Sequence, residues 1–173
     1  MDDRTYRYAD GPTTEVERLV AASPGDVWAV VVDITMPARF STELQEATWC
    51  DDAPGPALGA RFVGRNRHPV VGEWETTSTV VELVANERFG WDVGDPECPA
   101  ARWRFTLEPA DGGTRLTQWV QLGPGRSGLS PAIEAMPDKE SRIIANRLAE
   151  HRANMEATLT GIAAAAERTA AAP

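Results

Sequence analysis

His151 is the residue whose type and position most directly suggest chemistry. It lies between Leu148 and Met155 in a C-terminal segment where apolar residues recur at helical spacing. A histidine within such a stripe points to the same side as its apolar neighbours, toward the protein interior. Because imidazole titrates near neutral pH, His151 can transfer a proton or donate a hydrogen bond to a ligand carbonyl. The alternative is a buried histidine that pairs with a neighbouring group and only supports the fold.

Other polar candidates occur in two runs that have the two-residue period of β-strands. Trp74, Thr76 and Ser78 share one side of the first run, and Gln118 shares a side with Val120 in the second. Small hydroxyl groups beside aromatic rings suit a ligand cavity that has a few orienting polar groups. A glutamine on an inner face needs a hydrogen-bond partner, which is a neighbour, a water or a ligand.

Tryptophan is abundant, with six Trp against four Phe and two Tyr in 173 residues. Alternation places Trp103 and Phe105 on one face of a strand and Trp91 on one face of its neighbour, while Phe62 shares a side with two polar or small residues. Inward tryptophans are either core residues or cavity walls. We assign Trp91 and Trp103, together with Trp74, to the walls of a cavity.

Trp28 and Trp119 are predicted to lie outside the cavity. Trp28 falls on the first predicted helix, where we expect it to pack that helix against the sheet. Trp119 has the opposite phase to Gln118, so it faces outward. There it is either an isolated surface aromatic or part of a homodimer contact.

Asp33 and Arg39 flank a helix break, where they pair with each other or Arg39 meets an acidic ligand group.

Secondary-structure patterns divide the chain into a strand, two short helices, six further strands and a long helix. Ser23-Pro24 starts the first helix, Met36-Pro37 interrupts it, and the final helix covers 138–168. The opposite phase of Val81 and Leu83 indicates either a β-bulge or a shifted register in the fourth strand. Short connections make the sheet antiparallel. The predicted strands are 14–22, 44–49, 61–67, 76–83, 88–93, 102–108 and 114–122.

Composition excludes several classes of function. The formal net charge of -9 argues against a nucleic-acid partner and against docking on anionic membranes. No apolar run approaches the roughly 20 residues needed to span a bilayer. Two cysteines and two histidines give no metal-binding or cofactor motif, so we expect neither a metal nor a cofactor. A start without a basic, apolar signal peptide predicts a cytoplasmic protein.

Four phrases, in this order, resemble a known superfamily. They are AASPGDVWAVVVDITMPARFS (21–41), ALGARF (57–62), VVELVANERFGW (80–91) and WRFTLEPADGGTRLTQ (103–118). Together they resemble the START-related, birch-pollen-allergen-like superfamily (SRPBCC), and within it the polyketide cyclase/dehydrase group. The resemblance implies an α+β helix-grip fold, in which a curved seven-stranded antiparallel sheet wraps round the C-terminal helix. It also implies a ligand cavity between the sheet and that helix.

Three functions remain open, because such a fold hosts unrelated activities. The first is binding of an apolar small molecule such as a polyketide, a lipid or another ring-containing metabolite. The second is an aromatase/cyclase enzyme with His151 as the best single catalytic candidate. The third is a stress- or chaperone-linked protein-interaction module. The expected ligand-binding residues are Phe62, Trp74, Thr76, Ser78, Trp91, Trp103, Phe105, Gln118, Val120, Leu148, His151 and Met155.

The expected domain organisation is simple. Residues 1–12 are polar and end in Asp10-Gly11-Pro12, which indicates a flexible leader. Residues 13–168 form a single helix-grip ligand-binding domain. Residues 169–173 follow the long helix and are expected to fray.

Overall fold

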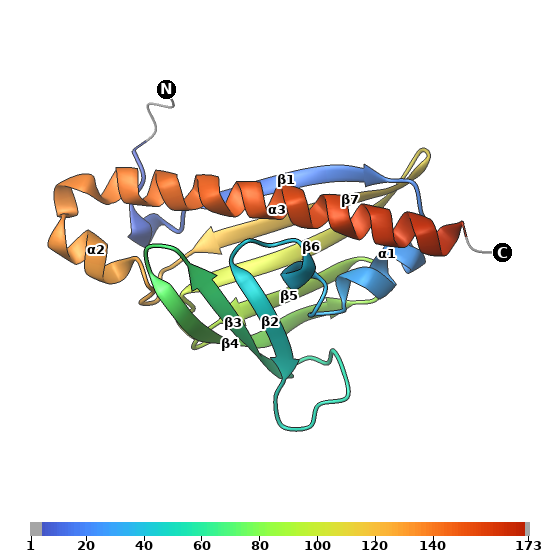
Figure 1. The fold of residues 1–173 in the computed structure, drawn as a ribbon, viewed down its shortest axis with the longest axis horizontal. Helices are drawn as coiled ribbons and strands as arrows, with labels where there is room; N and C mark the ends of the chain where they lie inside the picture. Colours follow the sequence, from blue (N-terminus) through green and yellow to red (C-terminus); the bar gives the residue numbers. More distant parts are fainter. Residues whose placement is uncertain (1–4, 172–173) are drawn as a thin grey trace.

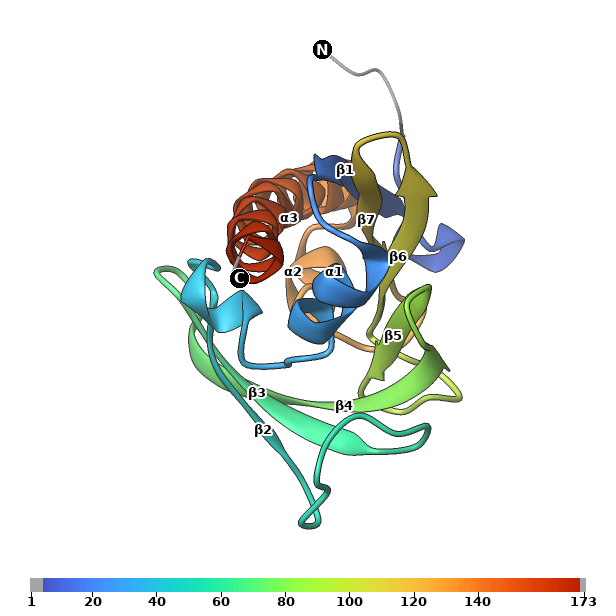
Figure 2. The ribbon, with the colours of Figure 1, turned by 90° about the vertical axis from the view of Figure 1, so that its right-hand side faces the viewer.

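The computed structural model describes residues 5–171. Seven antiparallel strands form one sheet in the order β1-β7-β6-β5-β4-β3-β2, and the long helix α3 crosses its concave side (Figures 1 and 2). This confirms the helix-grip fold expected from the sequence. The strands are β1 (Thr13–Val20), β2 (Leu44–Trp49), β3 (Arg61–His68), β4 (Gly72–Val84), β5 (Arg88–Val93), β6 (Ala101–Ala110) and β7 (Gly113–Leu122).

The helices follow the predicted order. Two short helices come after β1, and the long helix begins two residues later than predicted and ends two residues later. The α-helices are α1 (Pro24–Val31), α2 (Ser130–Ala135) and α3 (Glu140–Ala170), and the 3-10 helices are η1 (Tyr8–Asp10), η2 (Pro37–Arg39) and η3 (Pro137–Lys139). Within residues 5–171, no helix is long and apolar enough to cross a membrane.

The start of α1 shows how local sequence sets an element. The Ser23 hydroxyl accepts a hydrogen bond from the backbone N–H of Asp26 at 3.2 Å, and Pro24 occupies the first helical turn. Ser23 thereby satisfies one of the N–H groups that a helix start leaves without a partner. The sequence prediction for this helix start is confirmed.

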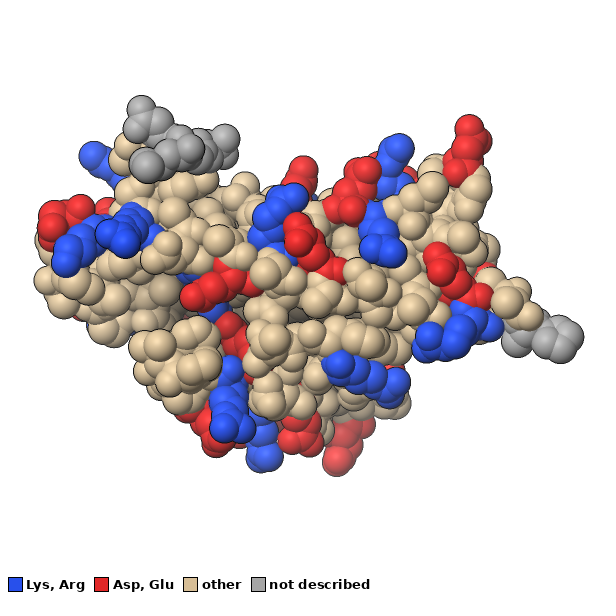
Figure 3. Space-filling view, turned by 45° about the horizontal axis from the view of Figure 1, so that its top comes forward, with Lys and Arg blue, Asp and Glu red and all other residues tan. Residues whose placement is uncertain are grey.

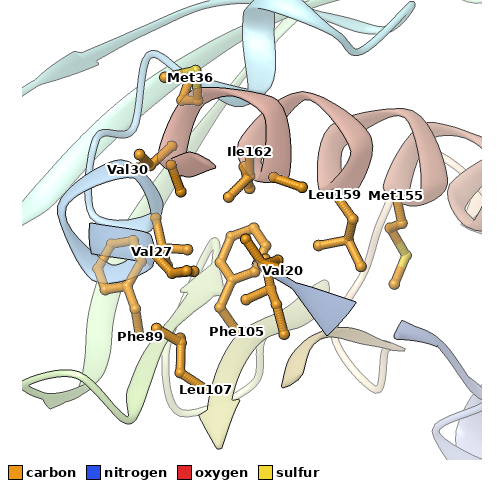
Figure 4. Close-up of a cluster of buried hydrophobic side chains, with 14 of the residues drawn as sticks. Val20, Val27, Val30, Met36, Phe89, Phe105, Leu107, Met155, Leu159 and Ile162 are labelled. Atoms are coloured by element: carbon orange, nitrogen blue, oxygen red, sulfur yellow. The ribbon is translucent and has the colours of Figure 1, made fainter. Parts of the chain in front are cut away.

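One apolar stripe attaches α3 to the rest of the fold. Every residue of the predicted stripe is buried: Ile144, Leu148, His151, Met155, Leu159 and Ile162. In Figure 4, the side chains of α3 meet those of α1 and of the sheet in one cluster. Gly161 lets the helix approach η2 closely, because a Cβ added there would overlap the ring of Phe40. The opposite, exposed face of the helix carries charges of both signs, which are intermixed in the space-filling view (Figure 3).

A β-bulge resolves the question of phase in β4. The register with β5 shifts between Val80 and Glu82, so Val80 pairs with Trp91 and Leu83 pairs with Phe89. Ser78 and Val80 are therefore buried on the concave side, and Leu83 also packs against the core beyond the bulge. The bulge therefore lets side chains of opposite phase face inward: Ser78 and Val80 before the extra residue, and Leu83 after it.

The predicted leader and tail lie partly within the described residues. Tyr8 donates its hydroxyl hydrogen bonds to the carbonyl oxygens of Ala100 and Gly125, each at 3.0 Å. Its backbone N–H donates to Glu140 at the start of α3. Tyr8 therefore contacts the domain, and the flexibility of the leader stays a prediction. At the other end, α3 continues through Ala170. Residues 1–4 and 172–173 of the predicted leader and tail lie outside the described residues.

Candidate functional site

A cavity of about 140 Å³ lies between the concave face of the sheet and α3. Side chains from α1, the segment that leads into β2, strands β3 to β7 and α3 all reach it. Its apolar lining consists of Val31, Ile34, Pro37, Leu44, Phe62, Gly64, Phe89, Trp91, Val93, Trp103, Phe105 and Met155. Its polar lining consists of Ser41, Glu43, Asn66, Thr76, Ser78, Gln118, His151, Asn154 and Thr158.

Aromatic rings form the sheet side of this cavity. Trp91 of β5 pairs directly with Trp103 of β6, and their rings stack with centroids 6.2 Å apart and planes 11° apart. Phe62 meets Trp91 edge-on at 5.9 Å, and Phe105 lies 6.0 Å from it. Cross-strand aromatic pairs of this kind stabilise a sheet by roughly 0.5–1.5 kcal/mol beyond their buried area. The wall is therefore a preorganised apolar surface.

His151 lies on α3 opposite this wall. Its imidazole meets the ring of Trp103 edge-on, with centroids 5.0 Å apart and planes at 90°. Burial lowers the pKa of His151 from its ordinary value of 6.5 to about 3, and the charge of Arg147, one turn earlier, acts in the same direction. The imidazole is consequently neutral at pH 7, with one N–H donor and one nitrogen acceptor.

Four polar side chains in the cavity form no hydrogen bond with any described residue. They are Ser78 of β4, Gln118 of β7, and His151 and Thr158 of α3. Each is exposed by 7% or less, and Oε1 of Gln118 has no partner and no solvent contact. Buried polar groups in folded proteins nearly always have a partner. Oε1 of Gln118 is therefore the buried atom of the described residues that lacks a partner, whereas the polar atoms of Ser78, His151 and Thr158 face the open space of the cavity.

The other polar lining residues are occupied by the protein itself. Asn66 donates to the hydroxyl of Thr76 at 3.3 Å and to the carbonyl of Gly64 at 3.1 Å. The Asn154 carbonyl oxygen accepts from the backbone N–H and the hydroxyl of Thr42, at 3.0 and 2.9 Å. The Ser41 hydroxyl accepts from two backbone N–H groups. These residues hold the cavity's rim together.

A buried ion pair supports the same rim. Arg147 of α3 donates to both carboxylate oxygens of Glu43, at 2.6 and 2.5 Å, and also to Glu150 at 3.2 Å. Burial lowers the pKa of Arg147, but its hydrogen bonds with the two carboxylates outweigh burial and leave the pKa above its ordinary value. Both partners of the Glu43–Arg147 pair are largely buried. The pair joins the start of β2 to α3.

Nine of the twelve expected ligand-binding residues line the cavity: Phe62, Thr76, Ser78, Trp91, Trp103, Phe105, Gln118, His151 and Met155. Trp74 does not, although Thr76 on the same face of β4 and Asn66, the cross-strand partner of Trp74, both do. Val120 is fully buried in the main core, and Leu148 belongs to a separate cluster with Leu122 and Ile144. Alternation predicts the face of each side chain correctly but not how far the cavity extends.

Sequence analysis missed several lining residues. Asn154 and Thr158 lie three and seven positions after His151, so the same helical spacing that singled out His151 would have found them. Ser41 and Glu43 lie in an irregular segment before β2. No periodic pattern covers such a segment, so only the tertiary structure identifies them.

The structure also shows the surroundings of Trp119, Asp33 and Arg39. Trp119 is on the outer face as predicted, but it is half-buried and the guanidinium of Arg104 lies over its ring at 5.2 Å. Asp33 does not pair with Arg39. Its carboxylate accepts from the backbone N–H and the hydroxyl of Thr35, at 3.0 and 2.6 Å. Arg39 is not part of the cavity lining.

Comparison with known proteins identifies the family. A sequence profile described as polyketide cyclase / dehydrase and lipid transport matches residues 12–167, which is nearly the whole chain. The chain belongs to this family. No curated protein sequence shows significant similarity to it.

Several solved structures share the fold. A polyketide cyclase-like protein of Corynebacterium glutamicum is 34% identical, with 87% of this chain and 88% of that chain covered and a TM-score of 0.60. The di-domain ARO/CYC protein StfQ of the steffimycin biosynthetic pathway has a TM-score of 0.68 at 14% identity. That match covers 92% of this chain and 52% of StfQ. A protein of Thermus thermophilus has a TM-score of 0.66 at 13% identity, with 92% of this chain and 100% of that chain covered. The last two likenesses concern the fold alone.

Proposed function

We propose that this member of the polyketide cyclase/dehydrase and lipid transport family binds a small, mostly apolar organic molecule between its sheet and α3. The observation that carries the proposal is a cavity whose aromatic wall faces polar side chains that have no partner among the described residues. A ligand would bury its apolar surface against the wall, which contributes about 25 cal/mol per Å². Its polar group would meet the side chains of Gln118, His151, Ser78 or Thr158.

The energetics of these polar side chains favour an occupied cavity. A buried polar group without a partner costs about 1–3 kcal/mol, so leaving Oε1 of Gln118 unpaired destabilises the folded chain. A core that served stability alone would place apolar side chains there, as it does at Val120 and Leu159 nearby. Retaining the polar groups is understandable if a ligand completes their hydrogen bonds.

The state of His151 favours binding over proton transfer. General acid–base catalysis is most efficient when the pKa of the catalytic group lies near the working pH. A pKa of about 3 makes the imidazole a weak base at neutral pH, although its N–H remains a good hydrogen-bond donor. An aromatase/cyclase that relied on His151 would need a substrate that raises this pKa. The geometry therefore supports a hydrogen-bonding role more directly.

The interaction-module alternative receives less support. A closed cavity, an exposed Trp119 face and a stoichiometric protein partner would favour it. Trp119 is instead half-buried, with the guanidinium of Arg104 over its ring.

Isothermal titration calorimetry with toluene and p-cresol tests the proposal. Both are small aromatic molecules of at most eight non-hydrogen atoms, and we expect dissociation constants below about 1 mM. Ser78→Leu fills the cavity and should abolish binding. Thr77→Leu, the matched control, changes the exposed neighbouring residue on the opposite face of β4 and should leave binding intact. Absence of binding to the unmodified protein, or equal binding by Ser78→Leu, would overturn the proposal.

A further inference from the structure

The volume of the cavity limits the number of rings that its ligand contains. An apolar protein cavity of about 150 Å³ holds one benzene molecule. The cavity between the sheet and α3 has almost the same volume, about 140 Å³. The walls cannot retreat easily, because Trp91 is in contact with Phe62, Trp103 and Phe105. The space therefore suits one aromatic ring with small substituents, and the further rings of a fused compound would extend beyond it.

The unpaired polar groups of the cavity indicate which polar substituent the ligand's ring carries. Oε1 of Gln118 is an acceptor that lacks a donor, and its amide nitrogen is a donor on the same group. His151 also offers one donor and one acceptor, and Ser78 and Thr158 contribute hydroxyls. A ligand hydroxyl both donates and accepts, so it can form the missing hydrogen bond with any of these groups. An ether or a ketone oxygen only accepts, and it leaves Oε1 of Gln118 unpaired.

Charge in and around the cavity excludes an anionic ligand. Among the described residues that line it, Glu43 is the single charged one. The cation beside it is Arg147, and Glu43 and Glu150 already occupy its guanidinium. His151 is neutral, so it provides no counter-charge. A carboxylate inside would be desolvated beside Glu43 without a counter-charge, which is strongly unfavourable.

We infer that the cavity selects neutral phenols with a single aromatic ring, and that Gln118 and His151 recognise the phenolic hydroxyl. This specificity presupposes the ligand binding proposed above. The aromatic wall of Trp91 and Trp103 packs on the ring, while the polar side chains select for the hydroxyl. Gln118 and His151 come from opposite layers of the fold, β7 and α3, and both reach the cavity.

A series of ligands separates the effects of the hydroxyl group, the charge and the number of rings on affinity. We expect p-cresol to bind about tenfold more tightly than toluene and 4-methylanisole, because only p-cresol donates a hydrogen bond. We expect 4-methylbenzoate to bind at least about a hundredfold more weakly than p-cresol, and the three-ring 2-anthrol to show no binding. Calorimetry with the unmodified protein measures all five compounds. If no compound binds, the proposed function itself fails.

Equal binding of toluene and p-cresol would overturn the phenol specificity and leave the proposed function standing. Binding of 2-anthrol or 4-methylbenzoate as tightly as p-cresol would overturn the limit to one ring or to neutral ligands.

Two variants test the recognition of the hydroxyl. Gln118→Leu and His151→Leu replace a polar side chain by an apolar one of comparable size. Each should bring the ratio of the p-cresol and toluene affinities closer to one, while toluene still binds. Binding of toluene shows that the variant retains a folded cavity. Thr117→Val, on the opposite face of β7, is the control and should keep the tenfold preference. An unchanged ratio in both Leu variants would overturn the assignment.

Discussion

Acid should destabilise this protein through His151 in a way that one substitution can isolate. The folded chain holds the pKa of His151 at about 3, whereas the ordinary value of 6.5 applies when the chain unfolds. Between these two values the unfolded state binds a proton that the folded state does not. The free energy of unfolding therefore falls as the pH decreases from 6.5 toward 3, and the contribution of His151 is fully retained above pH 6.5.

The magnitude follows from the difference in pKa. Each pH unit in this window costs about 1.4 kcal/mol of stability. Lowering the pH from 7 to 5 crosses about one and a half units of it, so His151 should remove about 2 kcal/mol. Arg147 lies one turn away and stays positively charged throughout, and it disfavours protonation of the imidazole at both pH values.

Urea unfolding of the wild type and of His151→Leu, at pH 7 and pH 5, measures this contribution. All other acidic and basic groups are the same in both proteins, so their effects largely cancel in the difference. We expect the stability of the wild type minus that of the variant to fall by about 2 kcal/mol between pH 7 and pH 5. A difference that stays constant would mean that His151 protonates in the folded protein as readily as in the unfolded one. That result would refute the assignment of a buried, neutral imidazole.

Three further substitutions have clear expected outcomes. Gln118→Leu removes an unpaired buried acceptor and should raise the free energy of unfolding by about 1 kcal/mol in urea, whereas a loss would indicate that the amide is paired. Arg147→Met leaves Glu43 buried without a partner and should cost about 3 kcal/mol. The double variant Glu43→Gln/Arg147→Met should recover most of that loss, and equal stability of the single and double variants would contradict the pairing. Trp119→Ala should leave the sedimentation coefficient unchanged, because Arg104 already covers the ring; dissociation of a dimer would support the homodimer hypothesis.

Much of the fold could be predicted because its signals are local. Ser23 and Pro24 start α1 through contacts within one turn. The helical stripe from Ile144 to Ile162 identifies the buried face of α3 without knowledge of its partner. Alternation likewise predicts that Trp91, Trp103, Phe105 and Gln118 face inward, because successive side chains of a strand point to opposite sides.

The extent and chemistry of the cavity depend on contacts between distant segments. Trp74 and Thr76 share a face of β4, yet only Thr76 lines the cavity. Glu43 is held at the site by its ion pair with Arg147, 104 residues away, and no sequence pattern predicts that contact. The sequence by itself determined that His151 is inward. Only the tertiary structure decided that it is neutral and lacks a hydrogen-bond partner among the described residues, because desolvation and partner geometry arise when α3 packs over the sheet.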